Sequence, residues 1–144
     1  MNPNQLSGEH FAAINDINQR RHAFIDYIGG FYNVNSRATS GSTCIYSKTG
    51  NSPGCAIGQF LSADLSAELD QSRGVYIETV SIHKQSLYLK IPAWMREMGV
   101  AFLLKCQRTH DDGVYWCDAG ISSCGLNRVK AIKQNIDNNL YDSI

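Results

Sequence analysis

Four residues have the side-chain types that cysteine-dependent catalysis requires: Cys44, Cys55, His110 and Asp111. This chemistry needs a thiolate, an imidazole that accepts its proton, and a carboxylate that holds the imidazole in one tautomer. The corresponding hypothesis is a hydrolase or transferase with Cys55 as nucleophile, His110 as base and Asp111 as the orienting group. The alternative for the same residues is structural, because free cysteines commonly pack as small apolar side chains.

The same cysteines and histidine could also bind a metal ion. Cys44, Cys55 and His110 supply three ligands, whereas tetrahedral zinc prefers four. Cys106 lies four residues before His110, so both side chains would face one side of a helix. No closely spaced cysteine pair of the usual zinc motifs occurs. We therefore expect no cofactor, with a small zinc-stabilised domain as an alternative, and we expect Cys106, Cys117 and Cys124 to pack.

Helices are predicted over most of the chain from the spacing of apolar residues. Residues 8–28 predict an amphipathic helix that Gly29 and Gly30 would end. A shorter helix is predicted over 59–70. Two more are predicted over 100–111 and 126–140. These elements would position His110 and Asp111 at the end of a buried helix.

Strands are predicted in two places. Cys44-Ile-Tyr46 and Cys55-Ala-Ile57 flank a turn rich in glycine and proline, which predicts a hairpin over 44–57 with the two cysteines close together at its base. Residues 75–91 contain alternating Val, Ile, Thr and Tyr and end before Pro92, which predicts two short strands. The expected fold class is α+β: one helix-dominated domain over residues 1–144, with a small β-hairpin or short antiparallel sheet.

Length and charge restrict the classes of function. The chain has 144 residues, of which 43% are hydrophobic, so it can bury the core of a single domain. Thirteen basic residues balance thirteen acidic ones, and this removes the electrostatic driving force for non-specific nucleic-acid binding. A basic patch would have to assemble in three dimensions. Its candidates in sequence are the pair Arg20-Arg21 and the trio Arg128, Lys130 and Lys133, which we expect on solvated helix faces.

The sequence also leads to expectations about location and assembly. It has no apolar run long enough to span a bilayer and no signal-peptide pattern. We therefore expect a cytoplasmic protein with reduced thiols and no membrane partner. The low charged fraction, 18%, is compatible with a homo-oligomer.

Several motifs together resemble a family of small uncharacterised proteins of tailed phages and prophages. The pattern is C-x-Y, then G-x-x-C-A-I-G, then Q-x-x-H-D and a tryptophan. Here the glycine directly precedes the cysteine in Gly54-Cys-Ala-Ile-Gly58, and Cys106 stands where the family usually has leucine. Gln107, His110-Asp111 and Trp116 match the later part. The resemblance implies a viral or mobile-element origin, a bacterial host cytoplasm and no established activity.

Small phage accessory proteins often bind and block host machinery. The leading expectation is therefore a protein that binds a host protein or ribonucleoprotein effector, such as an inhibitor of a bacterial defence system of the CRISPR type, without direct contact to nucleic acid. Polar loops would form its binding surface. The loop over 36–43 and the turn over 47–54 supply the candidates Arg37, Thr39, Ser40, Lys48 and Asn51.

Overall fold

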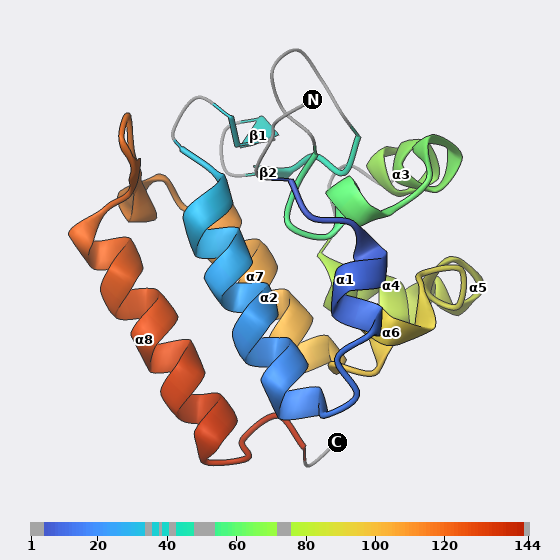
Figure 1. Cartoon of the computed structure of the whole chain (residues 1–144). Helices are drawn as coiled ribbons and strands as arrows, with labels where there is room; N and C mark the ends of the chain where they lie inside the picture. Colours follow the sequence, from blue (N-terminus) through green and yellow to red (C-terminus); the bar gives the residue numbers. More distant parts are fainter. Residues whose placement is uncertain are drawn as a thin grey trace.

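Three long helices form the framework of the molecule. In the computed structural model, α2 (Ile17–Phe31) lies beside both α7 (Val100–Asp111) and α8 (Ser123–Asp137), as Figure 1 shows. The structure describes residues 5–33, 36–37, 39–40, 43–47, 54–71 and 76–142, with the side chains of 39–40 and 43–44 excluded. The prediction of a helix over 100–111 is confirmed, and the last long helix begins three residues earlier than predicted.

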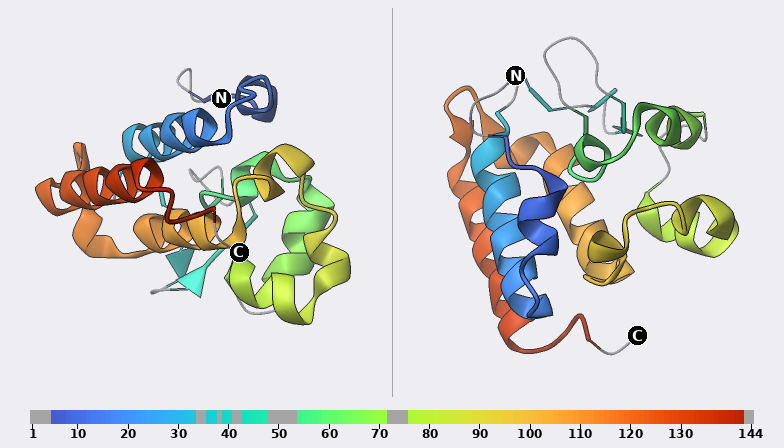
Figure 2. Two further views of the ribbon diagram at one scale, coloured as in Figure 1. Left: turned by 90° about the horizontal axis from the view of Figure 1, so that it is seen from below. Right: turned by 45° about the vertical axis from the view of Figure 1, so that its right-hand side comes forward.

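Shorter elements cover the other side of α7 (Figure 2). Antiparallel pairing joins β1 to β2, with Thr39 opposite Cys44, and β3 to β4, with Trp116 opposite Ile121. The result is a helix-dominated single domain with a small antiparallel hairpin, as the sequence predicted. The remaining elements are α1 (Gly8–Ala12), β1 (Thr39–Ser40), β2 (Thr43–Cys44), η1 (Gly58–Phe60), α3 (Ala63–Asp70), α4 (Ile77–His83), α5 (Gln85–Tyr88), α6 (Ala93–Arg96), η2 (Gly113–Tyr115), β3 (Trp116–Cys117) and β4 (Gly120–Ile121).

An aromatic cluster joins α1 and α2 to α6. The rings of Phe11 and Phe24, both fully buried, meet edge to face with centroids 5.3 Å apart. The Trp94 ring stacks on Phe11 at 5.7 Å, and Phe60 packs edge-on against both Phe11 and Trp94. Such pairs each contribute about 0.5–1.5 kcal/mol beyond the area they bury. The cluster therefore fixes the short helix α1 on the framework.

The N-terminal helix predicted over 8–28 is wrong in two respects. The chain leaves the helix after Ala12 and starts again at Ile17, because the Asp16 carboxylate caps the new helix by accepting a hydrogen bond from the Gln19 backbone N–H at 2.8 Å. The two glycines do not end α2 either. Gly29 lies inside it, where an added Cβ would come 3.3 Å from Val129, so this glycine allows α2 and α8 to approach closely.

The strands predicted over 75–91 are helices α4 and α5 in the structure. Ile77 and Val80 are three residues apart and fully buried, which is the spacing of one helix face, and α4 packs on α7. The Gln107 side chain accepts a hydrogen bond from the Ile77 N–H at 2.7 Å and so satisfies a free donor at the start of α4. Tertiary packing overrides the strand propensity of this segment.

The hairpin predicted over 44–57 is displaced towards the N-terminus. Its observed strands are β1 and β2, and residues 55–57 form a turn that leads into η1. The Cys55 backbone N–H nevertheless donates to the Ile45 carbonyl at 3.0 Å, so the two segments that carry the cysteines do lie side by side. The helix predicted over 59–70 begins only at Ala63, where the Ser62 hydroxyl accepts from the Leu65 N–H.

Arg20 and Arg21 are not on a solvated face, contrary to the prediction. They are 4% and 3% exposed. Arg20 donates to the Ile14 and Trp94 carbonyls and pairs with Glu97 at 3.0 Å. Arg21 donates to the Met98 carbonyl and pairs with Asp142 at 2.6 Å. Their guanidinium groups therefore tie α2 to α6 and to the C-terminal segment. In the ranges that the structure describes, no helix has both the length and the hydrophobicity needed to cross a membrane.

Candidate functional site

The glycine–cysteine motif forms a tightly packed unit around the Tyr46 backbone. Gly54 has a φ of +102°, which favours glycine, and an added Cβ at Gly54 or at Gly58 would overlap the Tyr46 carbonyl oxygen. The Tyr46 N–H donates to the Asp70 carboxylate at 2.7 Å, and its hydroxyl accepts from the Gln107 amide at 2.8 Å. Close backbone approach therefore accounts for both glycines of the motif.

Cys55 lies at the centre of this unit and has no exposed surface. Its sulfur accepts a hydrogen bond from the Gly58 N–H at 3.3 Å, within the turn that precedes η1. The predicted partner Cys44 is in β2, and its side chain lies outside the described part of the chain. As placed, the Cys55 thiol satisfies a buried backbone donor.

His110 and Asp111 form a buried pair at the end of α7, with 0% and 4% of their surface exposed. Nδ1 of the imidazole lies 2.6 Å from Oδ1 of the carboxylate. An ionised carboxylate can only accept, so in that state Nδ1 of the imidazole is the donor. The ring of His110 packs edge to face on Tyr32 at 4.7 Å, and the Tyr32 hydroxyl donates to the Gly54 carbonyl at 2.7 Å. Tyr32 therefore links His110 to the segment that carries Cys55.

Metal ligands do not gather in the described residues. Among them, no group of three or more His, Cys, Asp or Glu side chains is placed to hold a metal ion. Cys106 is fully buried, and this burial raises the pKa of its thiol, which keeps it neutral. Cys117 and Cys124, which we expected to pack, are exposed.

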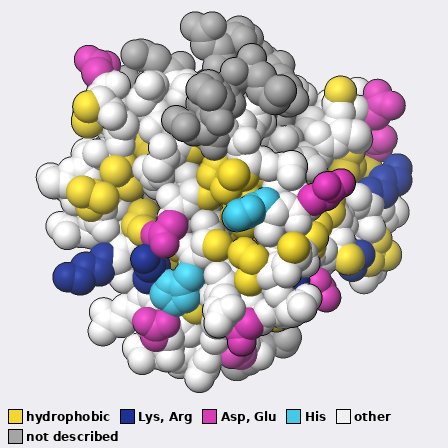
Figure 3. Space-filling view, viewed as in Figure 1, with side chains coloured by type: hydrophobic (Ala, Val, Ile, Leu, Met, Phe, Trp, Pro, Cys, Tyr) yellow, Lys and Arg dark blue, Asp and Glu magenta, His cyan; other side chains and the backbone are white. Residues whose placement is uncertain are grey.

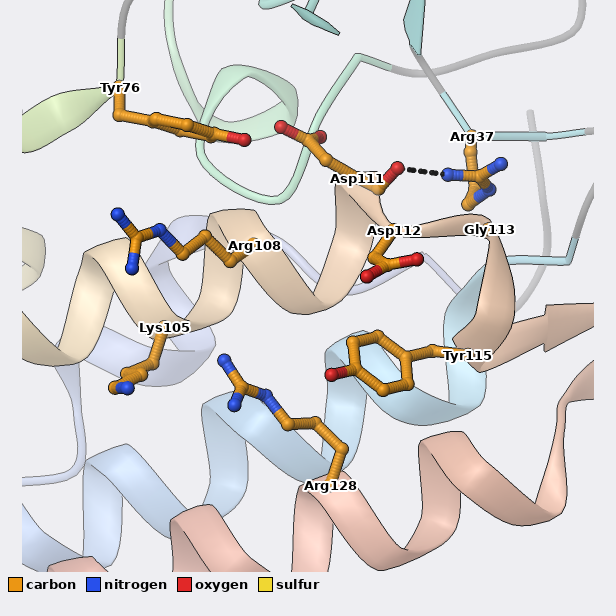
Figure 4. A pocket seen from close by; sticks show the side chains of 9 residues that line it. All are labelled: Arg37, Tyr76, Lys105, Arg108, Asp111, Asp112, Gly113, Tyr115 and Arg128. Atoms are coloured by element: carbon orange, nitrogen blue, oxygen red, sulfur yellow. Dashed lines mark hydrogen bonds between the residues drawn. The ribbon is translucent and has the colours of Figure 1, made fainter. Parts of the chain in front are cut away.

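A basic pocket lies where α7 ends, next to η2 and α8 (Figure 4). Its volume is about 630 Å³. Four cationic side chains contribute to its wall: Lys105 and Arg108 from α7, Arg128 from α8, and Arg37 from the segment before β1. We call this cavity the basic pocket. Its wall also contains two tyrosines, two aspartates and a glycine: Tyr76, Tyr115, Asp111, Asp112 and Gly113.

Aromatic rings and hydrogen bonds hold two of these guanidinium groups in place. Arg108 lies over the Tyr76 ring at 5.7 Å, and Arg128 lies over the Tyr115 ring at the same distance. Arg128 also donates from Nε to the Thr109 hydroxyl at 3.2 Å. Cation–π contacts of this kind restrict a guanidinium group without neutralising its charge.

The positive charges of these four side chains are not neutralised by ion pairs within the described residues. In the regions that the structure describes, none of them forms an ion pair with a carboxylate, whereas Arg20, Arg21, Lys90 and Lys133 each do. The cations outnumber the two carboxylates of the wall, Asp111 and Asp112. The basic pocket therefore attracts anions. Because the whole chain has a net charge of zero, this local excess of positive charge means that charge is unevenly distributed over the molecule.

Arg37 is the one predicted binding residue whose side chain the structure places. Its Nη1 donates to the carbonyls of His110 and Asp111, at 3.1 and 2.7 Å, and so satisfies acceptors at the C-terminal end of α7. Thr39 and Ser40 lie in β1, with side chains outside the described region. Lys48 and Asn51 lie outside the described residues altogether.

The basic trio predicted from the sequence is divided between two surfaces. Arg128 lines the basic pocket, whereas Lys130 and Lys133 line a groove between α8 and α2. Lys133 is 3.0 Å from Asp26 there, and His22 is 2.7 Å from Asp137. Figure 3 shows this face, where acidic side chains adjoin basic ones and a histidine. Its charges are largely neutralised.

Sequence reasoning missed Lys105 and Arg108 as site residues. Their spacing of three on a predicted helix that ends at Asp111 was the available signal. The convergence of Arg128 and Arg37 on the same place depends on the fold. Comparison with protein-family models, curated proteins and solved structures finds no match for this chain.

Proposed function

We propose that the protein acts by binding, and that the basic pocket recognises an anionic group of its partner. The observation that carries this proposal is the gathering of Lys105, Arg108, Arg128 and Arg37 in one cavity without carboxylate partners among the described residues. Like charges held close together repel one another. An anion that enters the pocket removes this repulsion and gains charge-assisted hydrogen bonds.

The partner that we propose is a host protein or ribonucleoprotein effector. The support is the resemblance of the Cys44-to-Trp116 motifs to small phage and prophage proteins. Acidic side chains and phosphate groups both carry the negative charge that the four cations attract. The protein would then be an accessory factor that inhibits a bacterial defence system such as CRISPR.

A capture experiment with matched charge reversals tests this proposal. The wild type and Arg108→Glu are used to capture proteins from a bacterial host lysate, with Lys130→Glu as control because Lys130 is exposed and lines the other groove. We expect the same host component with the wild type and the control, and its loss with Arg108→Glu. Equal capture by all three proteins, or none above background, would contradict the proposal.

A cellular assay tests the inhibitory part separately. The gene is expressed in cells whose CRISPR system clears a target plasmid, and plasmid survival is measured. We expect survival to rise with the wild type and the Lys130→Glu control but not with Arg108→Glu. Survival at the level of an empty vector, in cells whose effector the protein does capture, would refute inhibition while leaving binding intact.

A cysteine-dependent enzyme is the second candidate. The observation that favours it is the buried His110–Asp111 pair at 2.6 Å, which has the imidazole–carboxylate geometry of such sites, with Tyr32 joining it to the Cys55 segment. Iodoacetamide labelling distinguishes the two candidates. An enzyme requires Cys55 to react below pH 7 faster than the exposed Cys117 and Cys124. Protection of Cys55 in the folded protein would rule it out.

A further inference from the structure

The basic pocket contains one buried acceptor that no donor among the described residues satisfies. Oδ2 of Asp111 is buried and has no hydrogen-bond partner in this part of the chain, although the other oxygen of the same carboxylate accepts from His110. Asp111 lines the pocket, and Figure 4 shows its carboxylate directed towards the hydroxyl end of Tyr76. A buried carboxylate oxygen without a donor is costly. A ligand that brings a donor as well as negative charge therefore suits this pocket best.

Two ligands that satisfy only the charge fit this acceptor or the size of the cavity less well. An aspartate or glutamate side chain has acceptors alone when ionised, so it offers nothing to Asp111. An inorganic ion would occupy a small part of a cavity of about 630 Å³. The remaining wall, formed by Tyr76, Tyr115 and the guanidinium planes above them, suits a flat ring.

We propose that the basic pocket binds a nucleotide. The phosphate lies against Lys105, Arg108 and Arg128, the base stacks on a guanidinium plane, and a sugar hydroxyl or an exocyclic amine donates to Oδ2 of Asp111. This inference rests on the proposed function, because it names the anionic group that the same pocket recognises. A free nucleotide and a nucleotide at the end of a strand share this chemistry.

The sequence-based expectation of no contact with nucleic acid came from the net charge. That argument concerns long-range attraction to a polymer of phosphates, which depends on many cations. A single nucleotide needs only a local cluster, and the fold supplies one from residues that are 91 positions apart in the chain at their extremes, Arg37 and Arg128.

Isothermal titration of the purified protein tests the inference. The titrants are AMP, GMP, CMP and UMP, with the corresponding nucleosides and inorganic phosphate as controls. We expect at least one mononucleotide to bind at least about tenfold more tightly than its nucleoside or phosphate alone, because the ligand needs both parts. A nucleoside or inorganic phosphate that binds as tightly as every mononucleotide, or no saturation by any of them, would overturn it.

Substitutions test which pocket residues bind the phosphate and which bind the donor group of the nucleotide. Arg108→Ala is expected to weaken nucleotide binding at least about tenfold, and Asp111→Asn to do the same, while Lys130→Ala changes it less than about twofold. Circular dichroism checks that each variant is folded, and Lys105→Ala replaces Asp111→Asn in deciding the question if the latter unfolds. Equal binding by the wild type and the folded pocket variants would refute the assignment.

A further titration distinguishes a free nucleotide from a nucleotide at the end of a strand. Tighter binding of a 5′-phosphorylated trinucleotide than of the mononucleotide indicates a strand end, and equal or weaker binding indicates a free nucleotide.

The results also distinguish failure of this inference from failure of the proposed function. Failure of every nucleotide, with host capture still lost in Arg108→Glu, contradicts this inference alone. Nucleotide binding without any host capture contradicts the proposed function alone.

Discussion

The Arg37 guanidinium lies 2.7 Å from the backbone carbonyl oxygen of Asp111, 74 residues further along the chain. The same Nη1 reaches the His110 carbonyl at 3.1 Å. One side chain from a polar segment therefore completes the C-terminal end of α7 and also brings a fourth positive charge to the basic pocket.

Replacement of Arg37 tests its role in stabilising the end of α7. Arg37→Ala is expected to lower the free energy of unfolding by about 1–3 kcal/mol, because two helix-end carbonyls lose a charged donor. Urea denaturation measures the loss. Lys130→Ala, on an exposed position without an ion pair among the described residues, is expected to stay within about 0.5 kcal/mol of the wild type. Equal effects of the two substitutions would argue against the capping role.

The buried arginine Arg21 leads to a second prediction. Arg21→Ala is expected to cost about 2–4 kcal/mol in urea denaturation, because the Met98 and Tyr141 carbonyls lose a charged donor inside the protein. Asp142→Ala removes the partly exposed partner of the same ion pair and is expected to cost less than about 1 kcal/mol. A larger loss in Asp142→Ala than in Arg21→Ala would show that the ion pair, and not the carbonyl contacts, stabilises this region.

The glycine of the cysteine motif leads to a third prediction. Gly58→Ala is expected to destabilise the fold by about 3 kcal/mol or to prevent folding, because the new Cβ would overlap the rigid Tyr46 backbone. Gly30→Ala is the matched control. It lies inside α2 with open space around it, so alanine there is expected to stabilise by about 0.5–1 kcal/mol. Thermal unfolding compares them, and a tolerated Gly58→Ala would refute the packing account of the motif.

Secondary structure could be predicted from the sequence where residue type and apolar spacing indicate the same element. The helix over 100–111 begins with the apolar run 100–104 directly after Gly99, and its prediction agrees with α7. The strands over 75–91 were wrong because the β-branched and aromatic residue types favour a strand, whereas Ile77 and Val80 have the spacing of one helix face and the contact with α7 selects the helix. The break at Asp16 was also missed, because apolar spacing continues across it and only the capping geometry reveals it.

The candidate site could be predicted only in part. His110, Asp111 and Arg37 were identified from residue type and context, and all three lie at or next to the basic pocket. Lys105 and Arg108 were not identified, and Arg128 was named only as part of a basic trio expected on a solvated helix face, because basic residues in a neutral chain usually lie on solvated surfaces. Arg20 and Arg21 were also expected on a solvated surface, but both are buried. Charge alone does not reveal which cations the fold gathers.

The buried thiol of Cys106 leads to a prediction about alkaline pH. Burial raises the pKa of this thiol above its ordinary value of 9.0. Its contribution to stability is therefore complete below about pH 9 and is lost as the pH rises further, because the unfolded chain then releases a proton that the folded protein retains. The free energy of unfolding is expected to fall as the pH rises above about 9, and to fall less steeply in Cys106→Ala. Equal slopes in the two proteins would contradict this.

The central claim is that the basic pocket binds a nucleotide. The most direct test is a nuclear magnetic resonance titration of the ¹⁵N-labelled protein with the mononucleotides, followed at the backbone amides. The account predicts saturable shifts concentrated in residues 105–113 and at Arg37 and Arg128, which Arg108→Glu abolishes. Shifts concentrated instead along the α2–α8 groove, at Lys130 and Lys133, or no saturable shift with any mononucleotide, would contradict it.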